Sequence, residues 1–177
     1  LLREHSENIS WLGLSMNSNG GQGVVYFGDI TCAGGITYTL SVPGAEYTSV
    51  YGPRYDATTE LFTFVGSYTL ENDTTIYAFL FRGEFNDLAN PAKYVFQMNF
   101  NPTLYTTSFT HSTDGMFAVG NSGSVEATDT YSWLYNIITE TYTPISFPNA
   151  KTTTTYGIIK NANGSYTIVG GYSSSKQ

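Results

Sequence analysis

Carboxylates in the polar connections of this chain are the side chains whose types and positions could bind a cation. They are Glu46, Glu71, Asp73, Glu126 and Asp129. Ca²⁺ and other hard cations prefer oxygen ligands, so these residues predict at most a weak cation site. The chain lacks the D-x-[DN]-x-[DN]-G loop of a strong Ca²⁺ site, and a solvated rim that keeps the protein soluble explains the same carboxylates. We therefore expect no cofactor, with weak Ca²⁺ binding as the alternative.

Catalytic motifs are weak in this sequence. Two carboxylates could hydrolyse a glycoside, but 14 acidic residues make some pair inevitable. His5 and His111 have no nucleophile in a recognisable context, and neither G-x-S-x-G nor H-E-x-x-H occurs. The Gly-rich stretch 20–23 lies between two predicted strands, with no helix to bind phosphate. We expect no catalytic residues and a non-enzymatic protein, with a glycoside hydrolase-like propeller domain as the alternative.

Aromatic side chains offer another kind of site, because they can stack on sugar rings. Trp133 and Tyr135 are the candidates that we retain from a chain with 15 Tyr, 11 Phe and 2 Trp. Core packing is the competing interpretation, since alternate residues of a strand point inward. The surplus of Tyr over what a core needs keeps glycan binding open.

Three N-x-[ST] sequons begin at Asn8, Asn72 and Asn163. Such tripeptides are acceptors for N-glycosylation in secreted proteins. A chain rich in Asn, Ser and Thr produces two or three of them by chance. They predict glycosylation only if the protein comes from a eukaryote.

Charge and composition exclude several classes of function. The net charge is −7, and the seven basic residues are scattered singly along the chain. Nucleic-acid-binding proteins instead cluster Lys and Arg to neutralise phosphates. The sequence contains no run of about 18 apolar residues, which is the length that a membrane-spanning helix needs. Charged residues make up only 12% and aromatic residues 16%, which is typical of all-β and of many secreted or cell-surface proteins. The single cysteine, Cys32, excludes an intrachain disulfide.

A glycine within a short apolar strand recurs at intervals of roughly 50 residues. These glycines are Gly13, Gly66, Gly120 and Gly170. Apolar stretches follow at 24–27, 76–80 and 131–134, then alternating strands at 38–42, 94–98 and 142–147. Further strands at 47–52, 105–110 and 152–157 precede the next glycine, and residues 42–52 align with 147–157 without a gap. Asp114-Gly115 and Asn163-Gly164 predict tight hairpins.

Four antiparallel strands per 50 residues are the dimension of a propeller blade. The sequence therefore predicts an all-β, β-propeller-like array of about three four-stranded repeats, incomplete or open. We expect an N-terminal tail at 1–10, a three-stranded partial repeat at 11–46, full repeats at 47–104 and 105–151, and a two-stranded partial repeat at 152–177. Exposed strand edges are templates for pairing, so self-association through blade edges is a further expectation.

The stretch 64–85, FVGSYTLENDTTIYAFLFRGEF, resembles the HAF-type extracellular repeat family. Residues 77–80, Tyr-Ala-Phe-Leu, stand where that family has His-Ala-Phe-Leu. SVPGAEYTSVYG and SFPNAKTTTTYGI resemble its V-P-G-A and Y-G-I pieces, while Gly28 and Trp133 depart from the pattern. The resemblance covers most of residues 11–172 and implies a secreted or surface-displayed array without catalytic residues.

We therefore expect an extracellular or cell-surface module that contacts protein or glycan, or that self-assembles. A structural sheath or wall subunit is a further alternative. The carboxylates named above belong to connections that leave a four-stranded repeat at the same end, so we expect them on one rim of the molecule.

Overall fold

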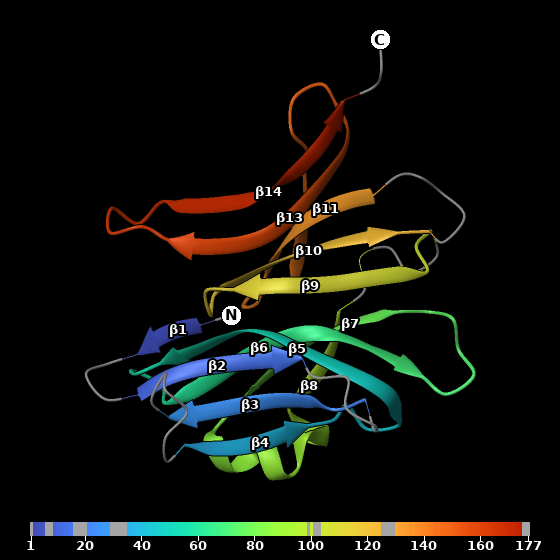
Figure 1. The fold of residues 1–177 in the computed structure, drawn as a ribbon. Coiled ribbons are helices and arrows are strands. Elements are labelled where there is room, and N and C mark those ends of the chain that lie inside the picture. The colour runs from blue at the N-terminus through green and yellow to red at the C-terminus, as the bar shows by residue number, and fades with distance from the viewer. Residues whose placement is uncertain are drawn as a thin grey trace.

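The structure of this protein is a computed structural model. It describes residues 2–5, 9–15, 21–28, 35–98, 100, 104–124 and 130–174. Within these ranges the chain is all-β, and the repeated elements are antiparallel strands (Figure 1). Two short 3-10 helices, η1 at Phe85–Ala89 and η2 at Pro91–Lys93, connect β7 to β8.

The strands follow one another along the chain, each separated from the next by a turn or connection. The first eight are β1 Leu2–His5, β2 Ile9–Ser15, β3 Gly23–Gly28, β4 Ile36–Leu40, β5 Ala45–Asp56, β6 Leu61–Leu70, β7 Tyr77–Gly83 and β8 Val95–Met98. The others are β9 Thr107–Thr113, β10 Phe117–Gly123, β11 Thr130–Asn136, β12 Thr141–Ile145, β13 Ala150–Lys160 and β14 Tyr166–Ser174.

Consecutive strands pair into antiparallel meanders. Among the described residues the sheets are β1-β2-β3-β4, β5-β6-β7-β8, β9-β10-β11-β12 and the two-stranded β13-β14. The predicted all-β class and the predicted four-stranded antiparallel unit are confirmed. One expectation was wrong: residues 2–5, assigned to an N-terminal tail, form β1 and pair with β2. The first sheet is therefore four-stranded, because the backbone of this polar segment completes the edge of β2.

The sheets stack face to face in sequence order (Figure 1). The first strand of each sheet packs on the second and third strands of the preceding one: β5 on β2 and β3, β9 on β6 and β7, and β13 on β10 and β11. The first strands also contact one another, β5 with β9 and β9 with β13. The described strands form an open array and not a closed ring.

The recurring glycines have a steric cause. A Cβ at Gly66, Gly120 or Gly170 would lie well under 3.0 Å from the carbonyl oxygen of Ser49, Phe109 or Thr154, respectively. Each of these oxygens belongs to the first strand of the same sheet. Glycine at this position therefore permits a close approach of two backbones, next to the β-bulges recorded at Val119/Gly120 and in the β13–β14 pair.

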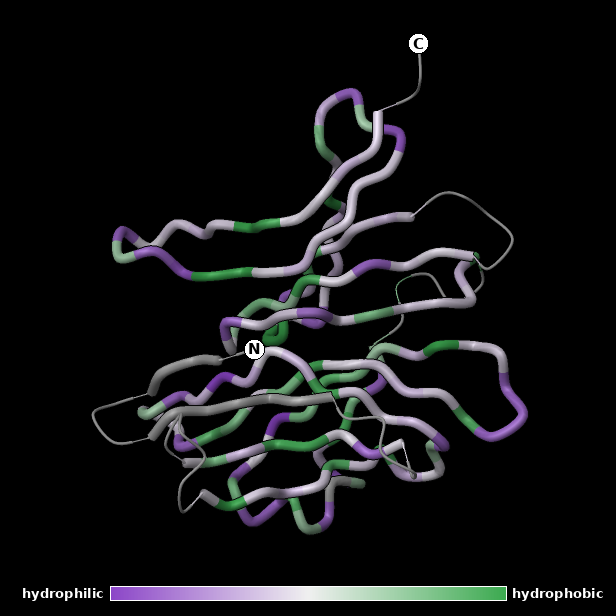
Figure 2. The backbone as a smooth tube through the Cα atoms, viewed as in Figure 1, coloured by the Kyte–Doolittle hydropathy of each residue, from purple (hydrophilic) through white to green (hydrophobic). Residues whose placement is uncertain are grey.

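Two apolar cores lie between the sheets. One is built around Phe27, Leu40, Val50, Phe64 and Phe79, where the first and second sheets meet. The other joins Val65, Leu80 and Met98 of the second sheet to Ala118 and Trp133 of the third. Figure 2 shows hydrophilic residues at turns such as the one joining β13 to β14. Each sheet thus loses exposed apolar area by stacking, as repeat units do.

Polar side chains tie the third sheet to β13. The side-chain amide of Asn121 donates to the Thr155 carbonyl at 3.1 Å, and its oxygen accepts from the Thr155 N–H at 2.8 Å. The Ser132 hydroxyl lies 2.6 Å from the Thr153 carbonyl and 2.8 Å from the Asn121 oxygen. Such a buried, satisfied network specifies one relative position of the two sheets.

The predicted hairpins have the expected backbone. Gly115 and Gly164 have φ angles of 96° and 83°, which glycine adopts without a steric penalty. Among the described residues no helix is long and apolar enough to cross a bilayer.

Candidate functional site

A cleft of about 410 Å³ opens where the second, third and fourth sheets meet. It lies at the end of the stack where turns join the first strand of a sheet to the second, namely β5 to β6, β9 to β10 and β13 to β14. Its lining residues include Arg54, Asp56, Arg82, Asp114, Ile159 and Lys160. The volume falls within the range of small-ligand pockets, about 300–1,000 Å³.

The positive charge of the cleft comes from three different sheets. Arg54 lies on β5, Arg82 on β7 and Lys160 at the end of β13. No ion pair joins any of the three to another residue that the structure describes. Arg82 is half-buried, and desolvation strengthens the attraction of a guanidinium for an anion. The Arg54 stem passes beside Gly115, where a Cβ would come within 3.2 Å of its Cγ.

The two carboxylates of the same cleft, Asp56 and Asp114, accept hydrogen bonds from backbone N–H groups of the turns in which they lie. Asp56 Oδ1 accepts from the Thr58 N–H at 2.9 Å. Asp114 Oδ1 accepts from the N–H groups of Met116 and Phe117 at 3.1 and 2.7 Å. The Thr58 N–H lowers the pKa of Asp56 below its usual value. One oxygen of each carboxylate therefore accepts hydrogen bonds within its own turn.

A second cleft of about 270 Å³ adjoins the first through Arg82. It is lined by Tyr135 of β11, by Glu140 in the turn between β11 and β12, and by Phe96 and Gln97 of β8. Burial raises the pKa of Tyr135 above its usual value, with a smaller contribution from the charge of Glu140. Tyr135, predicted as a binding residue, thus lies beside an opening and remains a candidate.

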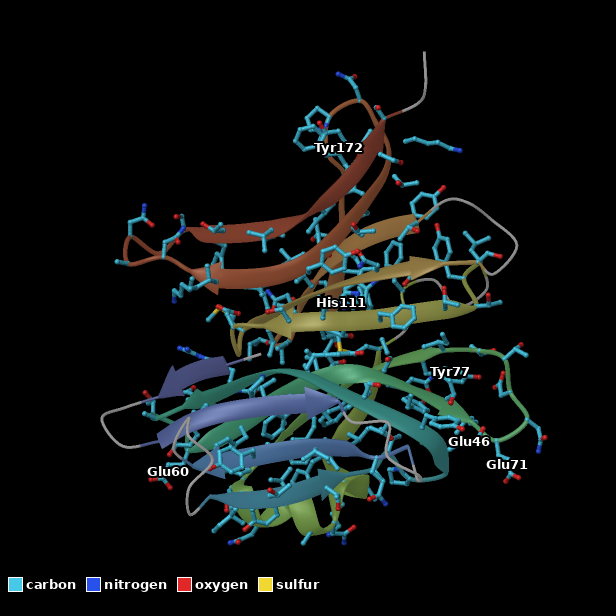
Figure 3. The ribbon with its side chains drawn as sticks, in the orientation of Figure 1. Glu46, Glu60, Glu71, Tyr77, His111 and Tyr172 are labelled. Carbon is cyan, nitrogen blue, oxygen red and sulfur yellow. The ribbon has the colours of Figure 1, made fainter. Side chains whose placement is uncertain are left out.

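The predicted acidic rim is only partly described. Glu46 and Glu71 lie at the same end of the second sheet, opposite Glu60 (Figure 3). Asp73 is occupied locally: it accepts from the Tyr77 hydroxyl at 2.7 Å and from the Thr75 N–H at 2.8 Å. These bonds, the Thr75 N–H first, lower its pKa. Glu126 and Asp129 lie outside the described residues, and within the described ones no group of three or more His, Cys, Asp or Glu could hold a metal ion.

Trp133 has a core position. Its side chain is fully buried, its indole N–H donates to the Ser122 hydroxyl at 3.0 Å, and its ring packs edge-on against Tyr142. In this structure the ring therefore offers no surface to a sugar, and we correct its assignment as a binding residue. The cause is the strand register, which places Trp133 opposite Gly120 on the inward face.

Two of the sequons lie on exposed turns. Asn72 is exposed between β6 and β7, with a φ of 59°. Asn163 is exposed between β13 and β14, and its side-chain oxygen accepts from the Ser165 N–H at 3.0 Å. Asn8 lies outside the described residues. Both described sequons are sterically open to a modifying enzyme, and their use stays a prediction.

The three basic residues of the larger cleft were not predicted as a group. They are scattered in sequence, and their convergence needs three sheets in a stack. One signal was present: Arg54 and Lys160 each stand near the end of a first strand, and equivalent strands of stacked repeats end on one side of the array.

Comparison of the chain with models of protein families, with curated proteins and with solved structures finds no match. The resemblance to HAF-type extracellular repeats therefore stays a prediction that rests on the residues quoted for it.

Proposed function

We propose that this chain is a non-enzymatic extracellular or cell-surface module, built as a propeller-like array, that binds acidic glycans through its larger cleft. One observation carries the proposal. In a chain of net charge −7, three of the seven basic residues line a single cleft. The four-stranded repeat and the resemblance to extracellular repeats support the expected location.

The chemistry of the cleft favours a carboxylated sugar. A guanidinium binds a carboxylate with two parallel hydrogen bonds, so Arg54 and Arg82 suit a planar anion. Met116, Ile138 and Ile159 supply an apolar wall against which a sugar ring can pack. A protein partner would need about 800 Å² of contact on each side, which a cleft of about 410 Å³ does not itself provide.

Binding to a panel of neutral and uronic-acid oligosaccharides tests this function. We expect binding to the uronic-acid members that weakens as salt is raised, because ion pairing drives it. Arg82→Gln and Lys160→Gln should each weaken binding about tenfold, equivalent to about 1.4 kcal/mol. Lys93→Gln is the matched control, since Lys93 is exposed on η2 and does not line the cleft. Equal loss in the control, or no binding of acidic sugars, would refute the proposal.

A glycoside hydrolase is a second candidate because Asp56 and Asp114 line the same cleft. A general acid needs a raised pKa, whereas the pKa of Asp56 is lowered. The arrangement therefore supports binding better than hydrolysis. Release of reducing sugar that Asp114→Asn abolishes, with folding intact, would reverse this preference.

A structural sheath or wall subunit would assemble through strand edges. Such a subunit forms large particles whose mass rises with concentration, which light scattering measures directly. A monomer that binds glycans at every concentration supports the binding module instead.

A further inference from the structure

The smaller cleft, of about 270 Å³, lies between β7 and β8 of the second sheet and the end of β11 in the third. Leu80 of β7 pairs with Phe96 of β8, and Met98 follows on the same face because side chains alternate along a strand. Leu80 and Met98 are 3% and 2% exposed, whereas Phe96 is 54% exposed. This side of the cleft therefore has an apolar floor and an exposed aromatic ring at its rim.

The opposite side of the smaller cleft is polar. It is formed by Tyr135 of β11 and by Glu140 in the turn between β11 and β12. The Tyr135 ring packs against Tyr142, with ring centroids 4.7 Å apart. A phenol hydroxyl both donates and accepts hydrogen bonds, whereas an ionised carboxylate only accepts them. This wall therefore suits an uncharged polar group, and its carboxylate repels a second anion.

Arg82 joins the smaller cleft to the larger one, because it lines both. It follows Leu80 by two positions on β7, so its side chain leaves the sheet on the same face. A carboxylate that reaches Arg82 from the larger cleft brings the next unit of the same ligand to the smaller cleft. The two clefts can therefore hold neighbouring units of one chain.

We propose that the two clefts bind successive sugars of one glycan, a uronic acid in the larger cleft and an uncharged N-acetylated hexose in the smaller one. This inference rests on the proposed function and specifies its ligand. The acetamido methyl group suits the apolar floor, its N–H can donate to Glu140, and its carbonyl can accept from the Tyr135 hydroxyl. The Phe96 ring gives the apolar face of the sugar a surface to pack on. Glu140 disfavours a second uronic acid here, because like charges at a binding interface repel.

Two tetrasaccharides of equal length separate this inference from simple charge attraction. One alternates glucuronic acid with N-acetylglucosamine, and the other consists of galacturonic acid alone and carries more carboxylates. Charge attraction by itself favours the polyuronate, whereas the paired clefts favour the alternating sugar. Isothermal titration calorimetry with the full chain measures both affinities. At about 0.15 M salt, where distant charges are screened, we expect the alternating tetrasaccharide to bind about tenfold more tightly.

Glu140→Gln tests the source of the preference. It should tighten binding of the polyuronate about tenfold, because the repulsion is lost, and should leave the alternating sugar unchanged, because the amide oxygen still accepts a hydrogen bond. Glu60→Gln is the matched control. Glu60 is exposed, stands directly before β6 as Glu140 stands before β12, has a φ of 58° against 56°, and lines neither cleft. It changes the net charge equally and should leave the preference as it was.

Phe96→Ala tests the aromatic rim of the smaller cleft. We expect binding of the alternating sugar to weaken about fivefold, in line with a lost aromatic contact, and binding of the polyuronate to stay the same. Phe147→Ala is the control, since this ring is 48% exposed and lines neither cleft. Circular dichroism checks that both variants fold, which the exposure of both rings leads us to expect.

The outcomes distinguish this inference from the proposed function. If neither tetrasaccharide binds, both are wrong. If the polyuronate binds at least as tightly as the alternating sugar, and Arg82→Gln weakens it, acidic-glycan binding stands and the second sugar position is lost. Equal effects of Glu140→Gln and Glu60→Gln on the preference, or of Phe96→Ala and Phe147→Ala on the alternating sugar, would also overturn it.

Discussion

Substitution of Gly120 by alanine tests the steric account of the repeat. The added Cβ would lie well under 3.0 Å both from the Phe109 carbonyl oxygen of β9 and from the Trp133 ring of β11. The oxygen belongs to β9, which pairs with β10 and packs on β6 and β7 of the second sheet, and the Trp133 ring is fully buried. Neither neighbour can move away without disturbing the core between the second and third sheets.

The expected cost follows from this geometry. Overpacking of a well-packed core costs about 1–3 kcal/mol. We expect the upper part of that range, about 2–3 kcal/mol, because one of the two obstacles is backbone. For a chain of this length such a loss lowers the melting temperature by roughly 4–12 °C.

Gly171→Ala is the matched control. Its Cβ would meet the rotatable Thr154 hydroxyl at 3.3 Å, and its φ lies outside the left-handed region. We expect unchanged stability or a gain of up to about 1 kcal/mol, since alanine restricts the unfolded chain. Thermal and urea unfolding followed by far-UV circular dichroism measure both variants. Equal midpoints for Gly120→Ala and Gly171→Ala would refute the steric explanation of the repeated glycine.

Three further predictions concern buried groups. Trp133→Ala should lower the free energy of unfolding by about 3–5 kcal/mol and Trp133→Phe by less, since a ring still covers Gly120; urea titration compares them. Burial holds the pKa of His111 below its usual 6.5, so the unfolded chain binds more protons there. Stability should therefore fall from pH 7 to pH 5 by at most about 1.4 kcal/mol per pH unit, and His111→Phe should remove this dependence. Asn121→Ala leaves the Thr155 N–H and carbonyl without their side-chain partner and should cost about 2–4 kcal/mol, with faster hydrogen exchange at β13 than at β6 as the local readout.

Local structure could be predicted from the sequence to a large extent. Alternating apolar residues and punctuating glycines located the strands, because side-chain alternation and turn geometry act over a few residues. The segment Leu2–His5 was missed because it shows no apolar alternation, and β2 supplies its partner. Trp133 was placed among binding candidates because a sequence does not reveal which face of a strand meets another sheet.

The cationic cleft could not be predicted as a site. Arg54, Arg82 and Lys160 belong to different sheets, and their meeting depends on how those sheets stack. Asp73 shows the same limit at short range. Its carboxylate accepts hydrogen bonds from Tyr77 and Thr75 in the turn. From its charge alone, the sequence predicted a carboxylate on the rim that could bind a cation.

The sequence by itself determined the four-stranded antiparallel unit and its repetition. Both the alternation of side chains along a strand and the glycine that two close backbones require can be recognised from residues that are close in sequence. Tertiary structure decided which faces became core, which cations share a cleft, and which aromatic rings cover Gly66 and Gly120. The physical reason is that stacking brings together residues about one or two repeats apart. No local pattern encodes the distances between them.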